Sequence, residues 1–168
     1  MRDPEETLEE LGLILDDLKE RSQDEVILVE GQKDRAALAV LGVDGDVRQV
    51  QGPGTVFALA EELAREGKRV IILTDWDRRG GQLAQLLRDG LKANGVRFDD
   101  ELRMKLAVLL KKDIKDIESL PAFFTRMVSL AQSPEVQKEM EMNRARKARK
   151  EHRANRERKA SDSSRPKP

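Results

Sequence analysis

Two short stretches, Glu25–Glu30 (EVILVE) and Arg69–Asp77 (RVIILTDWD), decide the fold of this 168-residue chain. Each contains a continuous run of β-branched and aliphatic residues that is too short for a helix, and each run is followed by acidic residues. Runs of this kind are typical of strands that are covered on both faces. The two stretches therefore predict the central strands of a parallel sheet.

The segments around these strands alternate between helical spacing and strand-like runs. This alternation favours crossover connections and an α/β fold with three layers and a four-stranded, mainly parallel sheet. In such sheets, ligands bind beyond the carboxyl ends of the strands. The further predicted elements are helices over Asp34–Leu41, Val56–Glu66 and Gln82–Lys92, and weaker strands over Val47–Val50 and Val96–Phe98.

Helical segments are predicted on both sides of this core. Leucine spacing predicts a helix over Pro4–Arg21, and two more are expected over Glu101–Lys111 and Ile114–Ala131, the latter with a break at Pro121. From Glu135 the chain is polar all round, which fits either a protruding helix or a disordered tail. The expected organisation is an N-terminal helix at 1–22, the α/β domain at 23–110, a helical extension at 111–132 and a basic tail at 133–168.

The residue types that the chain lacks exclude several kinds of chemistry. There is no cysteine, so disulfides and thiolate zinc sites are excluded, and the single histidine, His152, lies in the basic tail far from the acids. The first ten residues are acidic and lack the apolar segment of a signal peptide, and no run of 18 apolar residues could span a bilayer. We expect a cytoplasmic protein without a membrane partner.

Charge is distributed unevenly along the chain although the formal net charge is zero. Residues 133–168 contain 12 lysines and arginines against 6 acids, so the preceding residues are correspondingly acidic. A basic tail on an acidic body indicates an anionic partner for the tail.

Acidic residues follow both strong strands, where a ligand of an α/β sheet would bind. Glu30 ends the first stretch, and Asp75 and Asp77 end the second. Mg²⁺ prefers hard oxygen ligands such as these carboxylates. The alternative is that the acids are solvated strand ends or helix caps, as Asp77 could be for the helix that follows it. A metal site at this edge is the favoured interpretation. Because such a site requires the two strands to be neighbours, we expect them to be adjacent.

The same residues carry a resemblance to a known family. Val29–Asp34 (VEGQKD) resembles the VEGxxD signature of Toprim domains, and Thr74–Gly80 (TDWDRRG) resembles their DxDxxG signature. Gly52-Pro53-Gly54 is similar to the glycine-bearing segment after their second strand. The resemblance covers about 24–110, and the size is closest to the small stand-alone archaeal Toprim proteins.

The resemblance implies a Rossmann-like Toprim domain with one or two Mg²⁺ ions, for which Mn²⁺ could substitute. Glu30 would be the catalytic acid/base or a metal ligand, and Asp75 and Asp77 would bind metal. Asp34 matches the second acid of the first signature, which is required less strictly. Its main role would be to begin the helix that follows. Trp76 either stacks on a base or packs against the sheet.

Nucleic acid, either RNA or DNA, is the expected partner, and the tail resembles arginine-rich segments that bind phosphates. Protein partners are not indicated. The cations expected to contact nucleic acid are Lys33, Arg78, Arg79, Arg144, Arg146, Lys147, Arg149 and Lys150.

Three functions remain open. The first is Mg²⁺-dependent phosphodiester cleavage by a nuclease-like enzyme, and the second is a non-catalytic module that binds Mg²⁺ and nucleic acid. The third, a primase-type nucleotidyl transferase, is less favoured because no additional nucleotide- or zinc-binding domain is recognisable. The absence of tyrosine excludes cleavage through a tyrosyl-phosphate linkage by this chain alone.

Overall fold

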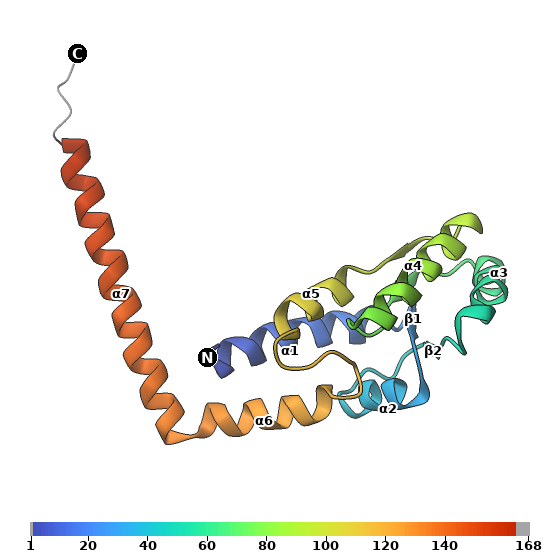
Figure 1. The fold of residues 1–168 in the computed structure, drawn as a ribbon, viewed down its shortest axis with the longest axis horizontal. Coiled ribbons are helices and arrows are strands. Elements are labelled where there is room, and N and C mark those ends of the chain that lie inside the picture. The colour runs from blue at the N-terminus through green and yellow to red at the C-terminus, as the bar shows by residue number, and fades with distance from the viewer. Residues whose placement is uncertain (1, 164–168) are drawn as a thin grey trace, which may run out of the picture.

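Four parallel strands form the centre of the computed structural model, which describes residues 2–163 (Figure 1). The spatial order is β2-β1-β3-β4, and all three strand pairings are parallel. The predicted α/β class and parallel sheet are therefore confirmed, as is the expectation that the two strong strands are neighbours. The strands are β1 (Val26–Val29), β2 (Val47–Gln49), β3 (Val70–Ile72) and β4 (Phe98–Asp99).

Side chains of the two central strands alternate between the two faces of the sheet. Val26 and Leu28 point into one hydrophobic cluster, whereas Ile27 and Val29 point into another. The first cluster is completed by α3 (Val56–Glu66) and α4 (Arg78–Ala93). Because both faces are covered, every residue of β1 and β3 is buried, as the continuous apolar runs predict.

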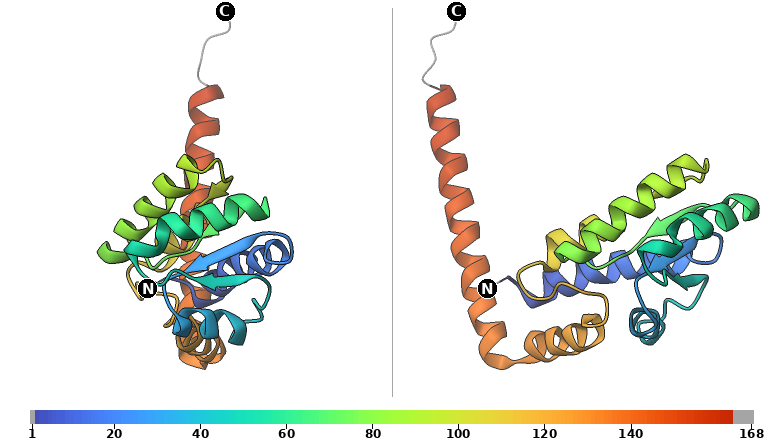
Figure 2. Two further views of the ribbon diagram at one scale, coloured as in Figure 1. Left: turned by 90° about the vertical axis from the view of Figure 1, so that its right-hand side faces the viewer. Right: turned by 45° about the vertical axis from the view of Figure 1, so that its right-hand side comes forward.

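The opposite face of the sheet is covered by helices from both ends of the domain. Leu18, Leu106 and Phe123 lie in the same cluster as Ile27, so the N-terminal helix and the helical extension pack on the sheet (Figure 2). The sheet and the helices on its two faces therefore form three layers. The helices of this face are α1 (Pro4–Arg21), α2 (Gln32–Val40), α5 (Glu101–Leu110) and α6 (Leu120–Gln132).

Three helices begin at positions that differ from the prediction. Helix α2 begins at Gln32 rather than Asp34, and the other two differ by more. Helix α4 begins at Arg78 rather than Gln82, because Asp77 caps it and Gly80 and Gly81 lie inside its first turns. Helix α6 begins at Leu120 rather than Ile114. Pro121 lies in its first turn, where the N–H that proline lacks would have no partner within the helix. A short 3₁₀ helix, η1 (Pro53–Thr55), includes Pro53 and Gly54 of the glycine-bearing segment.

Helix α7 (Pro134–Ser163) projects from the body (Figures 1 and 2). Of the two alternatives for the tail, the structure shows the protruding helix through Ser163. Residues 164–168 lie outside the described part. Within residues 2–163, no helix is both long and apolar enough to cross a membrane.

Candidate metal centre

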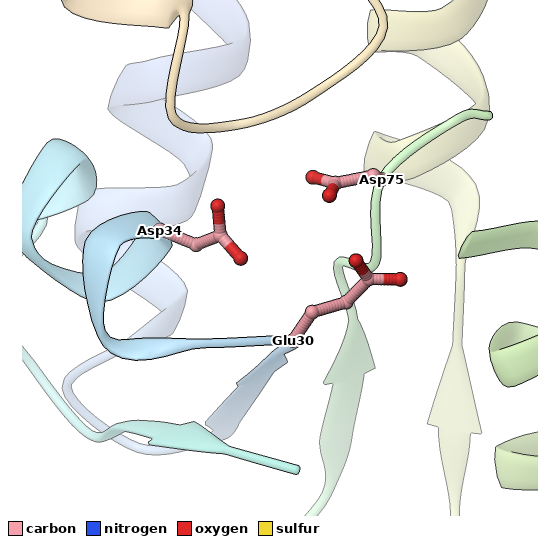
Figure 3. A group of neighbouring side chains, drawn as sticks. All are labelled: Glu30, Asp34 and Asp75. Atoms are coloured by element: carbon pink, nitrogen blue, oxygen red, sulfur yellow. The ribbon is translucent and has the colours of Figure 1, made fainter. Parts of the chain in front are cut away.

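Three carboxylates converge beyond the carboxyl ends of β1 and β3 (Figure 3). They belong to Glu30, Asp34 and Asp75, and one oxygen from each lies within 4.8 Å of the others. Glu30 follows β1, Asp75 follows β3 after two further residues, and Asp34 lies in the first turn of α2. We call these three residues the acidic cluster. Their approach follows from strand adjacency, since parallel neighbours end at the same edge.

Glu30 places one carboxylate oxygen in a buried position at this edge of the sheet. Its Oε1 atom is buried, and no hydrogen-bond donor among the described residues reaches it. A buried carboxylate oxygen without a donor is costly unless a cation compensates for it. The environment of Glu30 therefore fits a bound metal ion.

Asp34 has two roles in this arrangement. Its Oδ2 accepts a hydrogen bond from the Gly31 N–H at 3.0 Å, which closes the first turn of α2 as the sequence indicates. The same side chain is only 7% exposed, and it joins Glu30 and Asp75 in the acidic cluster. Burial, with repulsion from Asp75 second, raises the pKa of Asp34 to about 6.

Asp75 is tied to the loop that precedes α6. Its Oδ1 accepts a hydrogen bond from the Ile117 N–H at 2.9 Å. Burial, followed by the neighbouring Glu30 carboxyl, raises the pKa of Asp75 to about 7. Because burial and like charge raise the pKa values of Asp34 and Asp75, a cation bound beside these carboxyls would stabilise their charged forms.

The backbone between β3 and α4 is held by a buried cation that the sequence analysis did not single out. Arg103 of α5 donates from Nε to the Thr74 carbonyl at 3.1 Å and from Nη2 to the Asp75 carbonyl at 2.9 Å. The signal was present in the sequence, because Arg103 lies on the same face of α5 as the buried Leu106 and Leu110.

Gly80 completes this turn because no larger residue fits there. A Cβ atom at Gly80 would lie 2.0 Å from the Asp75 carbonyl oxygen. The Thr74 hydroxyl also donates to the Gly80 carbonyl at 2.8 Å. The glycine of the second signature therefore permits the close approach of α4 to the strand end that carries Asp75.

Asp77 does not lie in the acidic cluster. It is exposed, and its Oδ1 accepts a hydrogen bond from the Gly80 N–H at 2.6 Å as the N-cap of α4. Of the predicted ligands, the structure thus brings Glu30 and Asp75 together and adds Asp34. A metal contact of Asp77 stays a prediction.

An open cleft of about 670 Å³ adjoins the acidic cluster. Lys33 and Arg79 line it, whereas Arg78 is exposed at the start of α4 and is not among its lining residues. Its apolar wall is formed by Val50, Pro53, Leu83 and Leu86. The cleft therefore combines carboxylates, two cations and an apolar wall beside one another.

Trp76 packs at the edge of the second hydrophobic cluster rather than in the cleft. It is partly buried, and its Nε1 donates to the Ile114 carbonyl at 2.7 Å. Its backbone N–H also donates to the Lys115 carbonyl at 3.0 Å. Of the two roles considered for Trp76, packing is the one that the structure shows.

Known proteins resemble the chain in both sequence and structure. A family model described as "Toprim domain" matches residues 25–107. A UPF0292 protein of Methanosarcina barkeri is 37% identical over 121 residues, which is 71% of this chain and 84% of that protein. A UPF0292 protein of Methanocaldococcus jannaschii is 32% identical over 73% of this chain and 95% of its own length. The solved structure of a "putative protein from Aquifex aeolicus" matches with a TM-score of 0.56 and 29% identity, covering 65% of this chain and 96% of that one.

Proposed function

The chain belongs to the UPF0292 family of Toprim-domain proteins, and we propose on this premise that it uses Mg²⁺ to cleave phosphodiester bonds of nucleic acid. The observation that carries the proposal is the buried, donor-free Glu30 oxygen beside two further carboxylates. Family membership supports a Mg²⁺-binding function related to nucleic acid. Phosphodiester cleavage is the more specific part of the proposal, and it rests on the chemistry of the site residues.

The ligands of the proposed ion are Glu30, Asp34 and Asp75. Three carboxylate oxygens with mutual separations within 4.8 Å can face one small cation, with water and substrate phosphate as the remaining ligands. Mn²⁺ accepts the same oxygen ligands. A second ion would need a further acid, and Asp77 at the N-terminus of α4 is the candidate.

The side chains around the proposed ion would have separate roles in the reaction. When bound, Mg²⁺ supplies positive charge that stabilises the transferring phosphate and favours deprotonation of a nucleophilic water. Lys33 and Arg79 line the same cleft and would neutralise the non-bridging phosphate oxygens. The Glu30 carboxylate would accept the proton of the attacking water as the phosphorus–oxygen bond to the leaving group breaks.

The experiment compares cleavage and binding by the wild type and by Asp75→Asn. Labelled structured RNA, single-stranded DNA and duplex DNA are incubated with the protein in Mg²⁺, in Mn²⁺ and in chelator. We expect cleavage only with metal and only by the wild type. Asp44→Asn removes an exposed acid outside the acidic cluster and serves as the control.

The rival function, a binding module that does not cut, makes a different prediction in the same experiment. It predicts binding of these nucleic acids without metal-dependent cleavage by any of the proteins. Cleavage that persists in Asp75→Asn would instead contradict the proposed site.

A further inference from the structure

Helix α7 uses one of its sides to contact the body. Met140 is buried, and Arg144 donates from Nη2 to Asp3 at 2.7 Å and to Glu5 at 3.0 Å. Gln137 donates to the Ala131 carbonyl at 3.0 Å. At about 100° per residue, these contacts fall on one face of the helix. Arg144, although predicted to contact nucleic acid, is therefore engaged within the chain.

The other side of α7 carries a row of cations. Five basic residues follow the spacing i, i+3, i+4, i+7 and i+10, which places them on one face. Continued from Met140 and Arg144, the helical repeat directs this face away from the body. We call these residues the cationic stripe; they are Arg146, Arg149, Lys150, Arg153 and Arg156.

The cationic stripe is open to solvent and largely unneutralised. All five side chains are exposed. Arg153 pairs with Glu157 at 3.0 Å, while the other four have no carboxylate within salt-bridge distance in the part of the chain that the structure describes. The stripe extends over about 15 Å of helix, since each residue adds about 1.5 Å.

We propose that the cationic stripe binds the phosphate backbone of nucleic acid, away from the cleft. Duplex DNA carries one negative charge per about 1.7 Å along its axis, so several phosphates can face a stripe of this length. An anionic membrane fits less well, because α7 is exposed on all sides beyond Met140 and has no apolar face to bury in lipid.

This inference rests on the proposed function for its substrate class and deepens it by adding a second contact. Helix α7 and the end of the body that carries α2 and α4 lie on opposite sides of the molecule (Figures 1 and 2). The stripe would therefore hold a portion of nucleic acid that is remote from the bond at the cleft. Helix α7 would then contribute affinity for nucleic acid, and the acidic cluster would carry out the cleavage.

The test compares two triple variants of the full chain that remove the same charge from α7. One replaces Arg146, Arg149 and Arg153 of the stripe by glutamine, and the other replaces Lys147, Arg158 and Lys159 outside it. Glutamine preserves helix propensity, and circular dichroism confirms that α7 remains folded. Fluorescence anisotropy with labelled duplex DNA is measured over a range of KCl concentrations in chelator, so that cleavage cannot contribute.

We expect the stripe variant to reduce the slope of log affinity against log salt by about 3, since each lost phosphate contact contributes about 0.9. The control variant should reduce it by less than about 1. Equal losses in the two variants would overturn the assignment to this face, and no binding by the wild type would overturn the inference as a whole. Because chelator is present, neither result depends on whether the protein cleaves nucleic acid.

Sedimentation of the same proteins without DNA tests whether the stripe instead meets the acidic α1 of a second copy. We expect the wild type and the stripe variant to sediment alike. A wild type that self-associates, a stripe variant that does not, and unchanged DNA binding would overturn the proposal.

Discussion

The acidic cluster and helix α7 carry opposite charges and are positioned in opposite ways. The carboxylates of the acidic cluster are enclosed by two strands, α2 and the loop before α6, and their placement depends on the whole sheet. The cations of α7 are exposed and owe their alignment to the helical repeat alone. Charges of the first kind are costly and need compensation, whereas those of the second kind remain solvated until a partner arrives.

This difference bears on what a substitution should do. A change in the acidic cluster should alter metal binding, stability and pH dependence together, because these share one buried environment. A change in α7 should alter partner binding and leave the fold almost untouched.

Asp75→Asn is expected to have the largest effect. The amide keeps the shape and can still accept the Ile117 N–H, but it removes the charge that a cation needs. Mg²⁺ affinity measured by calorimetry should fall by at least about 100-fold, more than the loss of an outer-shell partner causes. The metal-free variant should be as stable as the wild type or more so at pH 8, because like-charge repulsion is relieved.

Asp77→Asn is the matched control for that change. Asparagine caps a helix as well as aspartate does, so stability should change by less than about 0.5 kcal/mol. Mg²⁺ affinity should stay within about threefold of the wild type, a difference below about 1 kcal/mol. A loss as large as that of Asp75→Asn would show that Asp77 is a ligand and would extend the acidic cluster.

Gly80→Ala should have the next largest effect. The added Cβ would lie 2.0 Å from the Asp75 carbonyl oxygen, so backbone must move. We expect a loss of about 2–3 kcal/mol in the free energy of unfolding, measured with urea, together with weaker Mg²⁺ binding. Gly12→Ala has nothing within 4 Å of its new Cβ in the middle of α1, and it should instead stabilise by about 0.5–1 kcal/mol.

The pH dependence of the metal-free protein should follow the raised pKa values of Asp34 (about 6) and Asp75 (about 7). Both pKa values exceed the ordinary aspartate value of 3.8, so the folded state holds these protons more tightly. The stabilising contribution of these two groups is then complete below about pH 4, and stability should fall as the pH rises from about 4 to about 7. Saturating Mg²⁺ should reduce or reverse this fall, because it binds the deprotonated form; an identical decline with and without Mg²⁺ would contradict the site.

Changes at the base of α7 should have only a small effect on the fold. Arg144→Gln removes two exposed ion pairs with Asp3 and Glu5. The free energy of unfolding should fall by less than about 1 kcal/mol, because exposed ion pairs contribute little. A larger loss would mean that α7 is part of the folded core and would weaken the contrast with the acidic cluster.

The sequence was informative where local chemistry determines structure. The apolar runs of β1 and β3 predict buried parallel strands, and the acids after them require these strands to be neighbours; the structure shows both burial and adjacency. Helix α1 has the predicted bounds, which are favoured by Asp3 as its N-cap, acids in its first turn and bases in its last turn.

Contacts between residues that are far apart in the sequence were not predictable in the same way. Asp34 reads as a helix-opening residue because its capping role is local, whereas its approach to Asp75 depends on how α2 returns to the sheet. The loop before α6 resembles a helix in its apolar content. It is instead held by hydrogen bonds to Trp76 and Asp75, residues about 40 positions away in the sequence.

Trp76 gives the protein an intrinsic optical reporter. It is the single tryptophan of a chain without tyrosine, so excitation near its absorption maximum reports one location only. Its indole hydrogen bond to the Ile114 carbonyl lies next to the loop that also holds Asp75. Emission intensity and wavelength should therefore follow any rearrangement of that loop as ions are titrated, without a label and in the unmodified protein.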